Sequence, residues 1–190
     1  MRKFILILIF IFFPNALNAS EINNIIDKTT VFLMNNWDSD ESLKKIYPPQ
    51  VVTTNKGTKV YGGCGDYKSG IDVGGSYYCP ATHTIVLDPK QLEKFVKYFG
   101  NSSIAFVIAH EFAHALQEGL GMKYEKPNSE LQADCLAGYF IQKGNKELEI
   151  TRENILEMAS AAYRIGSKSH GTGAQRAYAL LSGMGRVDLT

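Results

Sequence analysis

The sequence lacks an excess of charge of either sign. Its 190 residues include 20 Lys and Arg against 19 Asp and Glu, and no basic run stands out. Proteins that bind nucleic acid through its phosphates usually show such an excess, so we expect no nucleic-acid partner. Only 21% of the residues are charged and 45% are apolar, which excludes low-complexity disorder and predicts one ordinary globular domain.

Long hydrophobic runs are scarce, and the uninterrupted one from Phe4 to Phe13 stands at the N-terminus. Two basic residues precede it, and a proline and a small-residue end that closes at Ala19 follow it, which is the layout of a secretory signal peptide. A helix of that length spans about 15 Å, roughly half of a bilayer core, so an uncleaved membrane tether is the less favoured alternative. We expect a signal peptide over residues 1–19 and a single mature domain over 20–190, periplasmic or secreted and without membrane contact.

Cysteines are few, at three in the whole chain. Export would permit disulfides, and Cys64 and Cys79 flank a segment rich in glycine and tyrosine. A bridge between them would close a loop of about fifteen residues, which the chain-entropy model values at roughly 3 kcal/mol. Cys135 lies in an apolar helical pattern and is interpreted as a buried, unreactive thiol.

The hydrophobic periodicity predicts an α+β fold in which a helix comes first, a few strands follow and helices fill the rest. Ser129 is a predicted N-cap and Gly144 a predicted helix end. A short hairpin is expected at 51–54 and 58–61, and a further strand at 82–87. The predicted helices cover residues 20–37, 89–99, 102–119, 129–143, 147–165 and 173–183.

The clearest chemical signal is an H-E-x-x-H motif in the helix predicted at 102–119. Its histidines, His110 and His114, are four residues apart and project from one helical face about 6 Å from each other, so both imidazoles can bind one cation. Glu111 points about 100° around the helix, toward the open side of that cation. The alternative is a pair of helix histidines satisfied by hydrogen bonds in a core.

Two histidines do not complete a catalytic zinc site, which usually has three protein ligands and a position left for water. The longer motif H-E-x-x-H-x-x-G-x-x-H is absent, because Gln117 and Leu120 stand where its Gly and last His would be. Glu118 lies about 12 Å along the helix axis from His110, too far for both to reach one ion. The third ligand must therefore come from another segment.

Glu130 and Asp134 are the best source of that ligand. They lie four residues apart on one face of the next predicted helix, which is otherwise apolar. Glu130 can bind the metal while Asp134 accepts a hydrogen bond from the second ring nitrogen of a ligand histidine. The alternative is a solvated acidic helix face, which the apolar neighbours of these two acids disfavour.

Four motifs in this order resemble the neutral zinc metallopeptidase family of bacteria and, more distantly, the gluzincin clan that includes thermolysin: GCG with YYCP and IVLD, then HEFAH, ELQADC and SHGTGAQR. The resemblance covers roughly Gly62 to Arg176. It implies a small zincin-like domain, with short antiparallel strands and an edge strand beside a mostly helical metal-binding core. It further implies one Zn²⁺ bound by His110, His114 and Glu130, Glu111 as the general base, and a Cys64–Cys79 disulfide.

The last of these motifs contains His170 and Arg176. The resemblance places such a histidine near the metal, where it could donate a hydrogen bond to the oxyanion of the reaction. Arg176 could order that loop or pair with a carboxylate of the site, and a structural role is favoured. In gluzincins an edge strand near the site pairs with extended substrate, and 82–87 is the candidate here, with His83 an ordinary strand residue.

Together these features predict an exported zinc metalloendopeptidase that acts on peptide or protein substrates. No G-x-S-x-G occurs, and Cys135 has no evident base partner, so no covalent mechanism competes. Two alternatives stay open: a non-catalytic, zinc-stabilised peptide-binding module, and a zinc amide hydrolase that acts on cell-wall peptides. Glu111 favours catalysis, because a purely structural zinc site would not need it.

Overall fold

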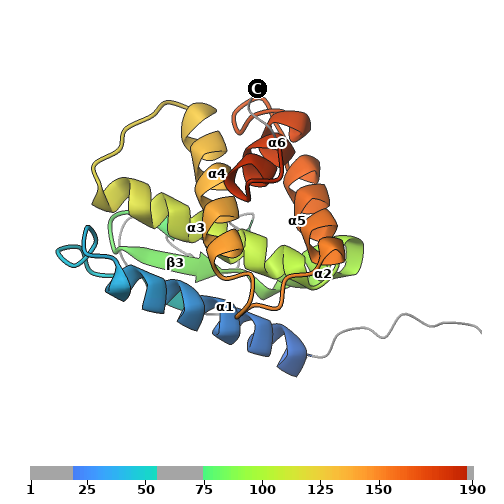
Figure 1. The fold of residues 1–190 in the computed structure, drawn as a ribbon, viewed down its shortest axis with the longest axis horizontal. Coiled ribbons are helices and arrows are strands. Elements are labelled where there is room, and N and C mark those ends of the chain that lie inside the picture. The colour runs from blue at the N-terminus through green and yellow to red at the C-terminus, as the bar shows by residue number, and fades with distance from the viewer. Residues whose placement is uncertain (1–18, 55–74, 188–190) are drawn as a thin grey trace, which may run out of the picture.

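The computed structural model describes residues 19–54 and 75–187 (Figure 1). The described elements are mostly helices with one small sheet, which confirms the predicted α+β class. In chain order they are α1 (Ala19–Ser39), β1 (Gln50–Thr53), β2 (Tyr77–Cys79), β3 (Thr84–Leu87), α2 (Pro89–Phe99), α3 (Ser102–Gly119), α4 (Asn128–Lys143), α5 (Arg152–Arg164) and α6 (Gly173–Gly183).

The sheet has the strand order β1-β3-β2, so β3 is its central strand. β3 pairs in parallel with β1 and antiparallel with β2, and all four of its residues are buried. The prediction that 82–87 is an edge strand is therefore wrong. Pairing on both sides explains its apolar sequence, and β2 is the described strand at the edge beside α3. The predicted strand at 58–61 lies outside the described residues.

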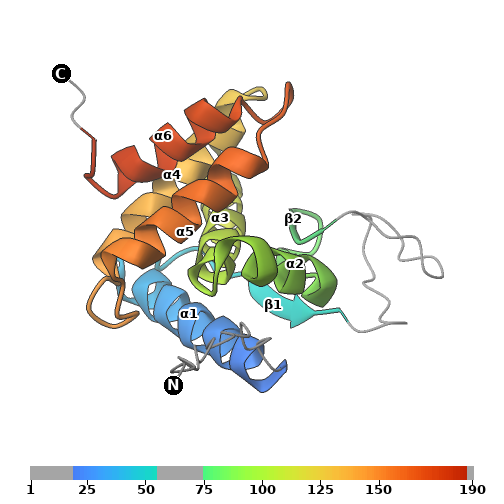
Figure 2. The same cartoon turned by 90° about the vertical axis from the view of Figure 1, so that its right-hand side faces the viewer.

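Helix α3 is the centre of the fold, with α1 on one side of it and α4 to α6 on the other in both views (Figures 1 and 2). Of its 18 residues, 14 are buried. A helix that is apolar on all sides belongs in a core, and α3 packs against strands and helices all round. The H-E-x-x-H motif therefore lies on the most buried helix, where polar side chains need partners or a ligand.

Three helices, α2, α3 and α6, begin and end as predicted, and two of them, α2 and α6, have local side-chain caps. Asp88 accepts a hydrogen bond from the Lys90 backbone N–H at the start of α2, and Pro89 follows at the first helical position. At the start of α6, Thr172 and Gln175 form a capping box. α3 also has the predicted bounds. These local signals required no knowledge of tertiary structure.

The other helices differ from the predicted bounds by one or two residues at the ends of α1, the start of α4 and the end of α5, and by five residues at the start of α5. Ser129 is not the N-cap of α4, because Asn128 already begins the helix and Ser129 lies inside its first turn. α5 begins at Arg152 rather than near 147, because the Thr151 hydroxyl accepts from the Asn154 backbone N–H and sets the start. Gly144 is the C-cap of α4, as predicted.

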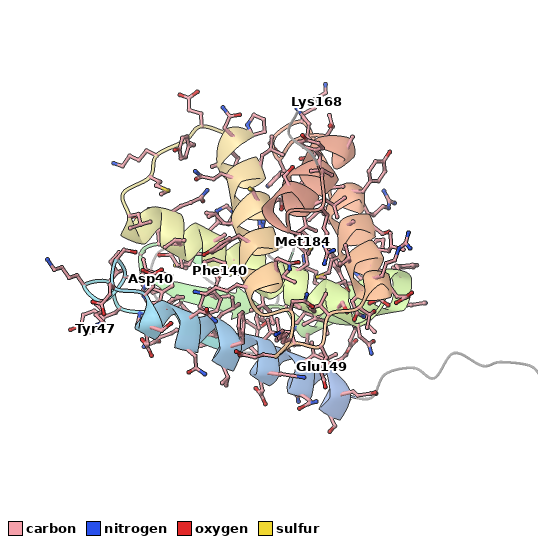
Figure 3. The ribbon with its side chains drawn as sticks, in the orientation of Figure 1. Asp40, Tyr47, Phe140, Glu149, Lys168 and Met184 are labelled. Atoms are coloured by element: carbon pink, nitrogen blue, oxygen red, sulfur yellow. The ribbon has the colours of Figure 1, made fainter. Side chains whose placement is uncertain are left out.

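The connection before α5 also returns the chain to α1. Glu149 lies beside that helix (Figure 3), where its carboxylate is 2.8 Å from Lys28 Nζ. Both side chains are largely exposed, so this ion pair contributes little to stability. The same α1 packs its apolar face on α3, and that packing holds the two helices together.

Two predictions for the N-terminal half concern residues that the structure does not describe. The signal peptide falls almost wholly on residues 1–18, and Cys64 lies within 55–74, both outside the described residues. Cys79 is buried at the end of β2, and its disulfide with Cys64 stays a prediction. Cys135 is a free, half-buried cysteine, and burial raises the pKa of its thiol. None of the described helices has the length and apolar character of a membrane span.

Helices α4 and α6 approach each other through glycine. A Cβ added at Gly138 of α4 would overlap the carbonyl oxygen of Leu180 on α6, and one added at Gly183 would overlap the carbonyl oxygen of Cys135. Both obstacles are backbone atoms, which cannot rotate away. The closeness of the two helices therefore depends on the absence of a side chain at these two positions.

Replacing Gly138 by Ala should destabilise the fold by about 1–3 kcal/mol, because the helices must separate to admit the methyl group. Intrinsic helix propensity alone predicts the opposite sign, a gain of about 1 kcal/mol. Chemical unfolding of the metal-free protein measures the difference. Lys143→Ala, at the exposed end of the same helix, is the control and should be nearly neutral. A stabilised Gly138→Ala protein would contradict the close contact of α4 and α6.

Candidate metal centre

Three side chains from two helices point at one spot between α3 and α4. His110 Nε2 and His114 Nε2 are 3.2 Å apart, and Glu130 Oε2 lies 3.4 Å from the first and 3.5 Å from the second. His110 and Glu130 are buried, and His114 is partly exposed. The three atoms thus form a nearly equilateral triangle with one face toward solvent.

The triangle has the size that a zinc ion requires. Ligands at about 2.0–2.1 Å from a tetrahedral ion lie roughly 3.3 Å from one another. Calcium prefers six to eight oxygens at about 2.3–2.6 Å, which two imidazoles and one carboxylate do not supply. The residues therefore fit Zn²⁺ with one coordination position left open, which is typical of a catalytic rather than a structural site.

The second ring nitrogen of His110 is held by a buried ion pair. His110 Nδ1 lies 2.9 Å from Asp134 Oδ1. The guanidinium of Arg176 donates two hydrogen bonds to the same carboxylate, from Nε at 2.7 Å and from a terminal nitrogen, Nη2, at 2.8 Å. Burial opposes ionisation of Asp134, but the hydrogen bonds from Arg176 and His110 outweigh it and hold the pKa of that carboxyl below its usual range. The structure thus brings Asp134 and Arg176 together at the site, a contact that corresponds to one of the two roles considered for Arg176.

The second ring nitrogen of His114 has a different partner. His114 Nδ1 lies 2.8 Å from Oε1 of Gln117, a side chain that is buried on the same helix. Sequence reasoning noted Gln117 only as the residue that breaks a longer zinc motif. Its spacing of three residues from His114 is the signal that could have revealed the contact, since such side chains are neighbours on a helix.

Glu111 lies beside the three donor atoms but is not one of them. It is 7% exposed, faces the same cleft and accepts a hydrogen bond from the Tyr78 backbone. Burial raises the pKa of its carboxyl above the usual range, although the nearby histidines oppose the shift. A carboxylate with a raised pKa in the same cleft as the donor triangle can exchange a proton with water bound there.

His170 lies at the rim of the site rather than among the ligands. Its Nε2 is 3.7 Å from Glu130 Oε1 and 3.3 Å from Lys126 Nζ, and its Nδ1 is 2.9 Å from the hydroxyls of both Ser167 and Ser169. Burial lowers the pKa of the ring, which favours the neutral form. Sequence reasoning missed Lys126, whose Nζ lies 2.9 Å from Glu130 Oε1.

A cleft of about 570 Å³ is lined by most of these groups, namely His110, Glu111, His114, Gln117, Lys126, Glu130, His170 and Arg176. Tyr77 and Tyr78 of β2 line it together with the three residues of the metal-binding triangle. Four apolar side chains also line the cleft: Phe95, Phe106, Val107 and Ile165. The cleft therefore combines a few convergent polar groups with an apolar wall, as ligand sites usually do.

Comparison with known proteins gives one result for this chain. The model of a family described as "Putative neutral zinc metallopeptidase" matches residues 18–182, a span that includes the whole metal centre. Neither the curated proteins nor the solved structures give a match. The resemblance that the four motifs indicated is thus confirmed over most of the chain.

Proposed function

The chain belongs to the neutral zinc metallopeptidase family, and on that premise we propose that it is an exported zinc endopeptidase that hydrolyses peptide or protein substrates. The observation that carries the proposal is the triangle of His110 Nε2, His114 Nε2 and Glu130 Oε2, with the buried Glu111 lining the same cleft. A zinc ion that only joined two helices would need neither the open face nor that carboxylate.

The residues of the site divide the chemistry among them. His110, His114 and Glu130 would hold one Zn²⁺, which would supply a water acidic enough to ionise near neutral pH and a positive charge to polarise the scissile carbonyl. Glu111 accepts the proton of the attacking water and then donates it to the leaving nitrogen. The raised pKa of its carboxyl suits both steps, because a base that is too weakly basic could not take the proton.

His170 is placed to assist at the oxyanion. Its Nε2 lies at the cleft, 3.3 Å from the Lys126 ammonium, which can only donate. Donation to an oxyanion therefore requires the tautomer in which Nδ1 accepts from the hydroxyl of Ser167 or Ser169 and Nε2 carries the hydrogen, with Lys126 bonded to Glu130 Oε1 instead. A neutral imidazole that donates there would stabilise negative charge on the carbonyl oxygen as the tetrahedral species forms. We assign His170 this role, and Arg176 the role of holding Asp134 and thereby His110.

Strand β2 is the surface on which we expect extended substrate to bind. It pairs with β3 on one side, and Tyr77 and Tyr78 line the cleft. A peptide laid along β2 would pass the Glu111 carboxylate, which already contacts the Tyr78 backbone. β-strand addition of this kind gives affinity through the main chain and leaves side-chain preference to the apolar wall.

Peptide hydrolysis itself tests the proposal. The purified, zinc-loaded protein should cleave an unfolded protein and a peptide library, lose that activity to a chelator and regain it with added zinc. Absence of cleavage in the zinc-loaded protein, with zinc bound at one per chain, would favour the peptide-binding module instead. If the protein released peptides from peptidoglycan and left protein substrates uncleaved, it would be the cell-wall amide hydrolase.

Replacing Glu130 by Ala should lower zinc affinity by more than about 100-fold, because loss of groups that merely support zinc ligands already costs 10–100-fold. Competition with a chromogenic chelator measures the affinity. Glu118→Ala is the matched control, since Glu118 lines the same cleft but lies outside the donor triangle. Full zinc affinity in the Glu130→Ala protein would remove Glu130 from the ligand set.

A further inference from the structure

The buried amide of Gln117 joins the two helices that carry the metal-binding side chains. Its Nε2 donates to the Ser129 carbonyl oxygen at 2.8 Å and to Gln132 Oε1 at 2.9 Å, both on α4. Its Oε1 lies 2.8 Å from His114 Nδ1 on α3. Both amide hydrogens and the amide oxygen therefore have partners.

These contacts fix which end of the amide faces His114. A backbone carbonyl can only accept, so the group that contacts the Ser129 oxygen must be the NH₂. The oxygen of Gln117 then necessarily faces the imidazole. His114 Nδ1 must carry the hydrogen, and the lone pair of its Nε2 is left free to point at the centre of the donor triangle.

We propose that Gln117 is a positioning residue of the metal centre: it fixes the tautomer and ring orientation of His114 and ties that ligand to the turn of α4 next to Glu130. This inference rests on the proposed function, because it presumes that the triangle binds zinc. Ser129 precedes Glu130 in the chain, so one buried side chain sets the position of a ligand on α3 against that of the ligand on α4.

The second ring nitrogens of the two histidines thus contact groups that differ in charge. His110 is backed by the Asp134 carboxylate with its Arg176 partner, whereas His114 is backed by a neutral amide. A carboxylate at position 117 would also accept from His114 Nδ1, but it could not donate to the Ser129 carbonyl. Replacing Gln117 by Glu therefore keeps the acceptor for His114 Nδ1 but removes the hydrogen bond to α4, so the two contributions can be measured separately.

The test measures zinc affinity in the full chain by chelator competition, in wild-type protein and in Gln117→Leu, Gln117→Glu and Gln132→Leu. Gln117→Leu removes all three contacts and should weaken zinc binding by about 10–100-fold. Gln117→Glu keeps the acceptor for His114 and should recover part of that loss. Gln132→Leu leaves the contacts of Gln117 to His114 and Ser129 in place, so its zinc affinity should stay close to that of the wild type.

Thermal unfolding of the metal-free proteins separates positioning from general stability. If Gln117 serves only the packing of α3 on α4, Gln117→Glu will bind zinc no better than Gln117→Leu, and zinc affinity will follow metal-free stability across the series. That outcome, or wild-type zinc affinity in Gln117→Leu, overturns the inference. Because no substrate enters the measurement, its result is independent of whether the protein proves to be a peptidase.

Discussion

Replacing Glu111 by Gln should lower peptide hydrolysis by about 10²–10⁴-fold, the usual contribution of a positioned general acid or base, and should leave zinc binding intact. The amide has the size of the carboxylate, and its oxygen can still accept from the Tyr78 backbone. It cannot take a proton from water. Turnover of a peptide substrate and zinc content, measured on the same preparation, together check the prediction.

The control for Glu111 is chosen from the same cleft. Glu118 is exposed there and lies outside the donor triangle, so Glu118→Gln removes a carboxylate of equal charge without touching the proposed proton path. Its turnover should stay close to that of the wild type. Glu111→Gln protein that binds zinc and still cleaves peptide at the wild-type rate would require a different base.

Replacing Arg176 by Met should destabilise the metal-free protein by about 3–5 kcal/mol, the usual cost of leaving one partner of a buried ion pair without the other. Asp134 is 0% exposed and Arg176 3%, so the carboxylate would lose a buried cation without regaining the hydration that it has in the unfolded chain. The remaining hydrogen bond, from His110, leaves the second carboxylate oxygen without its cation. Urea unfolding measures the loss.

Two further variants locate the cause of that loss. Arg186→Met removes an exposed arginine and should change the free energy of unfolding by no more than about 0.5 kcal/mol. The double variant Asp134→Leu/Arg176→Met should recover part of the stability lost in Arg176→Met, because it also removes the buried charge. A loss of less than about 1 kcal/mol in Arg176→Met would mean that Asp134 is stabilised without it.

The elements with strong local signals were predictable from the sequence. The bounds of α2 and α6 follow from the caps at Asp88 and Thr172, and the H-E-x-x-H spacing already placed His110, Glu111 and His114 on one helix. The family followed from motif order. These inferences needed only neighbours within a few residues, where the chain's geometry is fixed by the helix itself.

What the sequence could not predict depends on distant contacts. Strand order in the sheet is decided by which segments meet, so the apolar run at 84–87 indicates burial but not which strands flank it. The hydrogen bond from Gln117 to the Ser129 carbonyl can be predicted only when the relative placement of two helices is known. The same holds for the hydrogen bonds from Arg176 to Asp134. For the same reason, the sequence singled out Glu130 and Asp134 but not the distances between them and the histidines.

The ion pair of Asp134 and Arg176 also bears on the order in which the metal centre forms during folding. Arg176 lies 42 residues after Asp134 and 66 after His110, on the last described helix. Bringing such distant segments together requires closing long loops, so these contacts form after the local ones. Until α6 packs on α4, Asp134 lacks the Arg176 guanidinium, and the carboxylate that contacts His110 is not held in place. We therefore expect high-affinity zinc binding, and any hydrolysis that depends on it, to appear only when folding is nearly complete.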